Sequence, residues 1–153
     1  MLKRIITDKM LLDNPNEKWN QFVDLLAMED YNDLSEIQKI PQLCFWYNSE
    51  VQNGGHLQYF LNQGVSLLNE TYVALKKLGA CSQSKILSKA IHILHKRGLA
   101  DIETVEEFVE EAFIMKFGDL DSKYYDCEPT VDELLAKYLL EHEQEFIITV
   151  PSE

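Results

Sequence analysis

The triplet Asn53-Gly54-Gly55, placed between two apolar segments, has the composition of a binding or catalytic loop. Glycine-rich loops bind phosphate when they follow a strand and end in a Lys-Ser/Thr pair, and this stretch has neither feature. Glycine also adopts left-handed conformations that a β-carbon disfavours, so the triplet predicts a sharp corner between two helices. One alternative stays open, in which Glu50, Gln58 and His56 line a ligand or substrate pocket at this corner.

The histidines and cysteines give little support for catalysis or metal binding. His92 and His95 could share one helix face, but no acidic residue lies close to them in sequence to complete a metal site. Cys44, Cys81 and Cys127 are spaced neither as metal ligands nor as a disulfide framework. We therefore expect no enzymatic activity, no metal and no cofactor, and a reducing, cytoplasmic environment.

Carboxylates form the most regular pattern of polar side chains. Five glutamates between residues 103 and 111 recur at helical spacing, where neighbouring side chains lie about 5–6 Å apart and each like-charged i, i+4 pair costs about 0.2–0.5 kcal/mol. A solvated face explains one such row, but the acids continue into the next segments, which favours a partner-binding surface. Its predicted residues are Glu103, Glu106, Glu107, Glu110, Glu111, Asp119, Asp121, Asp126, Glu128, Asp132 and Glu133.

The whole negative charge of the protein comes from its last third. Residues 1–98 contain 10 acids and 11 Lys/Arg, a net charge of +1, whereas residues 99–153 contain 16 acids and 3 Lys, a net charge of −13. Such a surface repels nucleic acids and membranes and attracts basic proteins. No apolar run reaches the ~20 residues of a membrane helix, and the N-terminus lacks the cleavage site of a secretory signal.

Apolar periodicity and capping residues predict an all-α fold, a single compact domain over residues 1–153 with about six to seven helices. One of these helices carries an apolar stripe of Val105, Phe108, Val109, Ala112 and Phe113 opposite the glutamates. The tail at 147–153 is either a short edge strand or an extended arm. Helices are expected at 15–28, from 35 or 41 to 51, and at 56–62, 66–79, 82–98, 105–113 and from 130 onward.

The stretch "EVQNGGHLQYFLNQG" resembles the signature of the bacterial DNA-mimic protein family. A second element, "LDSKYYD", is similar to the family's Leu-Asp motif, and the resemblance extends over about residues 35–147, leaving 1–34 as an N-terminal helix. His56 stands where the family usually has Phe, so a buried His56 would need a polar partner. The matching signature residues are Glu50, Asn53, Gly54, Gly55, Gln58, Tyr59, Phe60, Asn62 and Gly64.

This resemblance implies an all-helical domain, often dimeric, in which the signature is structural and surface carboxylates imitate DNA phosphates. It implies no catalytic residues. We therefore expect an acidic module that occupies the DNA-binding surface of a basic transcription factor or similar protein, with no direct binding of nucleic acid or membrane. An immunity or antitoxin-like protein that neutralises a basic toxin, an enzyme that uses the Asn-Gly-Gly corner, and a purely structural role are the alternatives.

Overall fold

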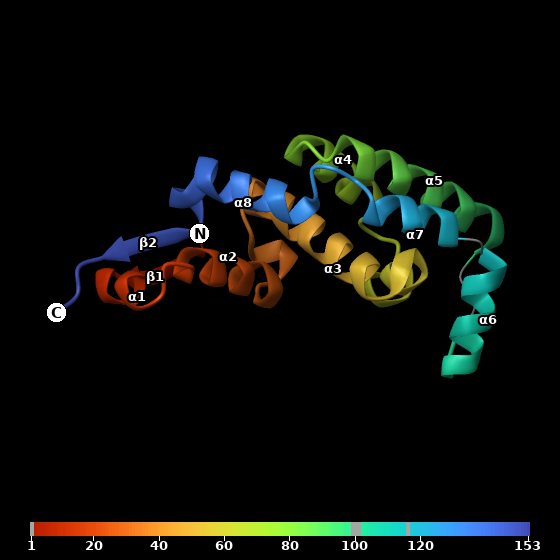
Figure 1. Cartoon of the computed structure of the whole chain (residues 1–153), viewed down its shortest axis with the longest axis horizontal. Coiled ribbons are helices and arrows are strands. Elements are labelled where there is room, and N and C mark those ends of the chain that lie inside the picture. Colours follow the sequence, from red (N-terminus) through yellow and green to blue (C-terminus); the bar gives the residue numbers. More distant parts are fainter. Residues whose placement is uncertain (1, 99–101, 116) are drawn as a thin grey trace.

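The longest helix, α3 (Glu36–Gln63), runs through the middle of the molecule (Figure 1). The structure is a computed structural model that describes residues 2–98, 102–115 and 117–153. Ser35 and Gln38 form a reciprocal capping box at its start, so Pro41 lies inside the helix and does not begin it. Gly54 (φ −154°, ψ 17°) and Gly55 (φ 79°, ψ −176°) depart from helical geometry. The chain therefore turns at the Asn-Gly-Gly triplet, and the predicted corner is confirmed.

Helices make up most of the described chain, which confirms the all-α prediction. The sequence patterns missed two short helices, α1 and α7. With α3, the elements in chain order are β1 (Arg4–Thr7), α1 (Asp8–Asp13), α2 (Glu17–Met28), the 3₁₀ helix η1 (Tyr31–Asp33), α4 (Leu68–Leu78), α5 (Cys81–Arg97), α6 (Val105–Met115), α7 (Gly118–Tyr125), α8 (Val131–His142), the 3₁₀ helix η2 (Glu143–Glu145) and β2 (Ile147–Val150). None of the helices within the described ranges combines the length and the apolar character needed to cross a membrane.

The two ends of the chain meet in a parallel two-stranded sheet. Strand β1 pairs with β2 in a register that places Arg4 opposite Ile147 and Thr7 opposite Val150. The tail is thus a strand, one of its two predicted alternatives, whereas β1 has no counterpart in the prediction. Ile6 of β1 and Ile147 of β2 are buried. The sheet lies at the end of the molecule opposite α6 (Figure 1).

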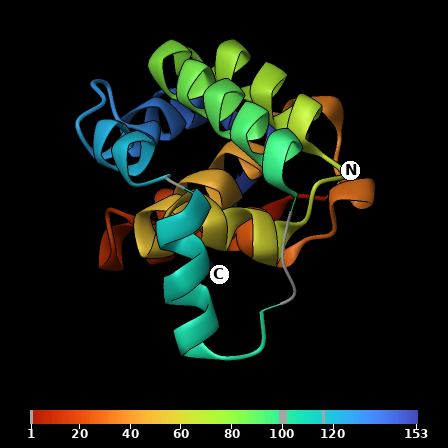
Figure 2. The ribbon, with the colours of Figure 1, turned by 90° about the vertical axis from the view of Figure 1, so that its right-hand side faces the viewer.

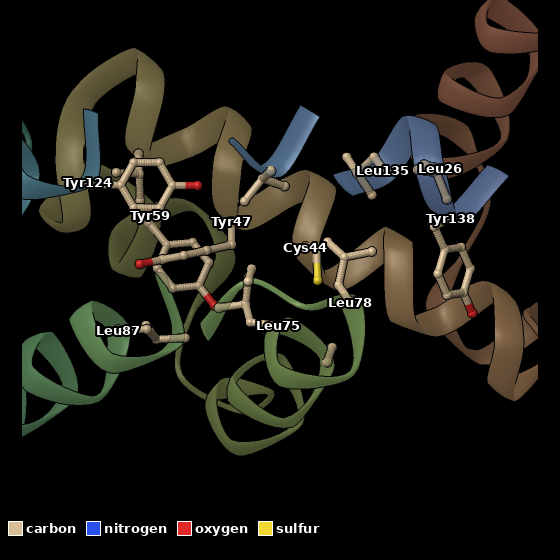
Figure 3. Close-up of a cluster of buried hydrophobic side chains, with 14 of the residues drawn as sticks. Leu26, Cys44, Tyr47, Tyr59, Leu75, Leu78, Leu87, Tyr124, Leu135 and Tyr138 are labelled. Atoms are coloured by element: carbon tan, nitrogen blue, oxygen red, sulfur yellow. The ribbon is translucent and has the colours of Figure 1, made fainter. Parts of the chain in front are cut away.

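One hydrophobic cluster runs along α3 and joins it to the surrounding helices. Around the second half of α3, Tyr47 and Tyr59 lie near Leu75, Leu87 and Tyr124 (Figure 3). Toward the sheet, the cluster continues through Leu26, Leu135 and Tyr138. In the helix that begins after Thr130, Val131, Leu135 and Tyr138 are buried, while Leu134 is only partly buried.

Helix α6 extends away from the rest of the molecule, as two perpendicular views show (Figures 1 and 2). The predicted apolar stripe is divided here. Phe108 and Ala112 pack against the hydrophobic cluster, whereas Val105 and Val109 are 76% and 61% exposed. The side chain of Phe113, the remaining predicted member, falls outside the described part of the structure. The described contacts of α6 with the body therefore lie along one edge of its apolar face.

Candidate functional site

The Asn-Gly-Gly corner encloses a buried histidine. His56 has no exposed surface, and its Nδ1 lies 2.6 Å from Oδ1 of Asp121 on α7. The same carboxylate oxygen accepts the backbone N–H of His56 at 3.0 Å. A carboxylate only accepts, so Nδ1 carries hydrogen, and in the tautomer with its hydrogen on Nδ1 the Nε2 atom accepts from the Tyr47 hydroxyl at 2.7 Å. The polar partner that a buried His56 requires is thus present on both sides of the ring.

The Tyr47 hydroxyl is well suited to this donor role. Burial and the surrounding tyrosines, including Tyr124, raise the pKa of Tyr47 well above its usual value, so its hydroxyl keeps its proton. The ring of Tyr47 packs edge-on against Tyr59 and Tyr124, with centroid distances of 4.9 and 5.4 Å. His56 is thereby fixed within an aromatic cluster that joins α3 to α7.

The other polar residues of the signature bind one another. Glu50 accepts from Nε2 of Gln58 at 3.2 Å and from Nδ2 of Asn62 at 2.7 Å, so these side chains connect the two halves of α3 across the corner. Tyr59 and Phe60 are buried, whereas Asn53 is exposed.

The ligand-pocket alternative required Glu50 and His56 to face a common cleft. The structure directs them to different partners, because Glu50 binds the amides of Gln58 and Asn62 while His56 is enclosed by Asp121 and Tyr47. Among the described residues, no group of three or more His, Cys, Asp or Glu side chains has an arrangement that could hold a metal ion. The convergence of Glu50 and His56 that this alternative predicts is therefore not present at the corner.

Helix α6 displays the acidic row that the sequence predicts. Glu103, Glu106, Glu107 and Glu110 are exposed, and Glu111 is half-buried. Glu107 also stabilises the start of the helix, since its backbone N–H donates to Thr104 Oγ1 at 3.1 Å and its carboxylate accepts from the backbone N–H of Glu103 at 3.2 Å. Glu106 and Glu110, one turn apart, remain as a like-charged i, i+4 pair.

The acids of α7 and α8 are not equivalent. Asp121 belongs to the predicted surface set, but His56 engages its carboxylate, so it holds the corner to α7. Asp119 lines a hollow of about 540 Å³ together with Lys89, His92 and Lys123, so its carboxylate shares this lining with two lysines. The remaining predicted residues are exposed, although Asp132 accepts a long 3.4 Å hydrogen bond from Asn48. They are Asp126, Glu128, Asp132 and Glu133.

A basic helix directly precedes the acidic one. Helix α5 contains no acidic residue, and its Lys85, Lys89, Lys96 and Arg97 side chains are all exposed. Counting charge over residues 1–98 conceals this concentration because the acids of the first 80 residues cancel it. A shorter counting window along the sequence would have found it. The acidic surface is therefore bordered by a positive one.

In the described part of the chain, the ion pairs of lysine and arginine involve carboxylates outside α6. Within residues 2–98, 102–115 and 117–153, no Lys or Arg ion pair includes a glutamate of α6, so no ion pair in these ranges relieves the repulsion along the row. The Lys and Arg ion pairs in these ranges are Arg4–Asp24, Arg4–Glu29, Lys18–Glu143, Lys39–Glu36 and Lys137–Glu141.

The comparisons with known proteins agree with the resemblance seen in the sequence. Searches of curated proteins and of solved structures each returned no match. A family model described as DMP19-like protein matches residues 32–142, a range that includes the Asn-Gly-Gly corner, His56 and Asp121. The chain therefore belongs to the DMP19-like protein family, the DNA-mimic family that its signature resembles.

Proposed function

We propose that this protein is a DNA mimic that binds a basic nucleic-acid-binding protein through the acidic surface of α6 and the α7–α8 segment. The observation that carries the proposal is the exposed glutamate row of α6, which lies on a helix that extends from the body. At the Asn-Gly-Gly corner, Glu50 binds Gln58 and Asn62 while His56 binds Asp121 and Tyr47, so Glu50 and His56 do not face a common cleft.

The spacing of the carboxylates suits a surface that ordinarily holds DNA. Side chains three or four residues apart on a helix lie about 5–6 Å from each other, and duplex DNA carries one charge per ~1.7 Å of its axis. The glutamate row is thus a line of negative charges that is less dense than the charges along a DNA duplex. Cationic side chains that bind phosphate would also bind these glutamates, and the repulsion within the row would fall on binding.

The membership of the chain in the DMP19-like family supports this assignment. Competition with DNA also predicts a strong dependence on ionic strength, because exposed charges beyond about 10 Å are screened at ~0.1 M salt. Electrostatic attraction raises the association rate above that of a neutral pair, so salt should slow the association of the two proteins.

The proposal is tested by capture from an extract of the native host at low and at high salt, followed by identification of the retained proteins. A retained DNA-binding protein is then purified and loaded with a labelled duplex, and the chain is added. We expect the wild type to displace the duplex at low salt. Glu106→Lys with Glu110→Lys should abolish displacement, whereas Glu107 is left unchanged because it stabilises the start of α6.

Asp13→Lys with Asp33→Lys is the matched control, since both acids are exposed and lie on other elements. The control changes the net charge equally and should retain most of the displacement. Circular dichroism checks that each variant keeps its helices. Displacement by the α6 variant at the wild-type level contradicts the proposal. If the retained protein is a toxic nuclease, the same surface acts as an immunity protein.

A further inference from the structure

Two valines of α6 lie largely outside the hydrophobic core. Val105 and Val109 lie one turn apart and are 76% and 61% exposed. Single exposed apolar residues are common, but valine is a poorer helix former than alanine or leucine because its branched side chain loses rotamer freedom. Two such residues on a helix with few contacts therefore contribute little to its stability.

Helical geometry places the valines directly beside the glutamates. Successive residues turn by about 100°, so the row of Val105 and Val109 lies between two others. On one side are Phe108 and Ala112, which contact the hydrophobic cluster. On the other side are Glu106 and Glu110, which are exposed. A partner that contacts the glutamate row would also contact the valine row.

We infer that these two rows form one docking face, whose occupant is a basic DNA-binding surface with an apolar strip beside its cations. This inference rests on the proposed function and names a second part of the same surface. Proteins that bind duplex DNA contact sugars and thymine methyl groups as well as phosphates. The valines of α6 take the place of that apolar component, while Glu106 and Glu110 take the place of phosphates.

Salt separates the contributions of the two rows. Loss of a glutamate weakens binding mainly at low salt, because screening already removes the charge interaction at high salt. Loss of a buried valine weakens binding at every salt concentration, since burial of apolar surface does not depend on screening by ions. The probe is the DNA-cellulose-binding protein fraction of the native host, applied to the immobilised chain.

Four forms of the immobilised chain are compared at increasing salt, with the retained proteins identified by mass spectrometry. Val105→Gln with Val109→Gln should reduce retention of DNA-binding proteins about tenfold at all salt concentrations, as about 1.4 kcal/mol of lost burial predicts. Glu106→Gln with Glu110→Gln should reduce retention only at low salt. Leu140→Gln should behave as wild type, because Leu140 is 79% exposed and belongs to α8, a helix that lies apart from α6 (Figure 1).

The outcomes separate this inference from the proposed function. If the glutamate variant loses binding and the valine variant does not, the docking face is wrong and the proposed function stands. If neither variant differs from wild type, both are wrong. Light scattering of the isolated proteins tests a further occupant, because a lower molecular mass of the valine variant would show that the valines cover a second copy of this chain and would overturn the inference.

Discussion

Oδ1 of Asp121 accepts two hydrogen bonds from one residue, His56: one from its ring at 2.6 Å and one from its backbone N–H at 3.0 Å. His56 replaces the aromatic residue usual in the family signature, and Asp121 belongs to the second family-like element, 65 residues further along the chain. The pair therefore connects the two motifs of the family through a side chain that departs from its pattern.

Removing this carboxylate should destabilise the protein. Asp121→Ala leaves the ring and backbone donors of His56 unpaired inside the core, which costs about 1–3 kcal/mol. Asp119→Ala is the matched control, because both acids lie in the first turn of α7 and gain similarly from the helix dipole. Urea unfolding measures both variants. In a His56→Phe background Asp121→Ala should cost less, because only the backbone N–H of residue 56 then loses its acceptor. Equal costs in the two backgrounds would show that the ring and the carboxylate are not coupled.

The corner should be intolerant of a β-carbon at Gly55. Gly55 (φ 79°, ψ −176°) and Gly64 (φ 73°, ψ −165°) share a backbone region that is essentially restricted to glycine, so alanine strains either position by about 1–3 kcal/mol. Only at Gly55 would the new β-carbon also meet Asp121, whose Cγ would lie 2.9 Å away, while nothing lies within 4 Å at Gly64. Gly55→Ala should therefore lower the free energy of unfolding more than Gly64→Ala, and similar losses would contradict the close approach.

Alkaline pH should unfold the protein cooperatively. Burial raises the pKa of Tyr59 and of Tyr138 to about 12, and it also raises that of Tyr124. In the unfolded chain tyrosine ionises near pH ~10, so above that pH the unfolded state binds fewer protons than the folded state. The contribution of these tyrosines to the free energy of unfolding is therefore fully present below pH ~10 and is lost as the pH rises toward about 12. Urea unfolding against pH measures this fall.

The tyrosinate absorbance of the same samples provides the check. Tyr59→Phe removes one of the protected groups and should make the decline in stability with pH shallower. Ionisation of all the buried tyrosines while the helical circular dichroism persists would show that their hydroxyls are accessible in the folded protein, contrary to their burial.

The features that the sequence predicted well depend on neighbouring residues. The corner at Gly54 and Gly55 and the ends of α4 and α5 at Gly79 and Gly98 follow from local backbone preferences. The spacing of the α6 glutamates likewise depends only on helical periodicity. These features were predictable because no distant residue decides them.

The features that the sequence did not predict depend on distant contacts. Asp121 reads as one more surface acid, and only the position of His56 across the fold shows that it is engaged. The exposure of Val105 and Val109 depends on how far α6 extends from the body, which periodicity does not specify. Strand β1 has four residues, and its partner lies at the opposite end of the chain.

The side chain that joins the two ends, Gln38, offers the last prediction. It is fully buried, and its Nε2 donates to the carbonyls of Leu2 at 2.6 Å and Glu145 at 2.8 Å. Gln38→Glu keeps the shape and the acceptor for the capping box but replaces both donated hydrogens with a carboxylate. The free energy of unfolding should fall by about 1–3 kcal/mol or more, because two carbonyls and a buried charge become unpaired.

The loss should be concentrated at the sheet. The amide of Arg4 donates to the carbonyl of Phe146 at 2.8 Å, next to the carbonyl of Glu145, so its hydrogen exchange reports whether the ends remain paired. In Gln38→Glu this amide should exchange faster than in the wild type, whereas Gln52→Glu, at an exposed position on the same helix, should leave it protected. Unchanged protection in Gln38→Glu would mean that β1 and β2 pair without the help of α3.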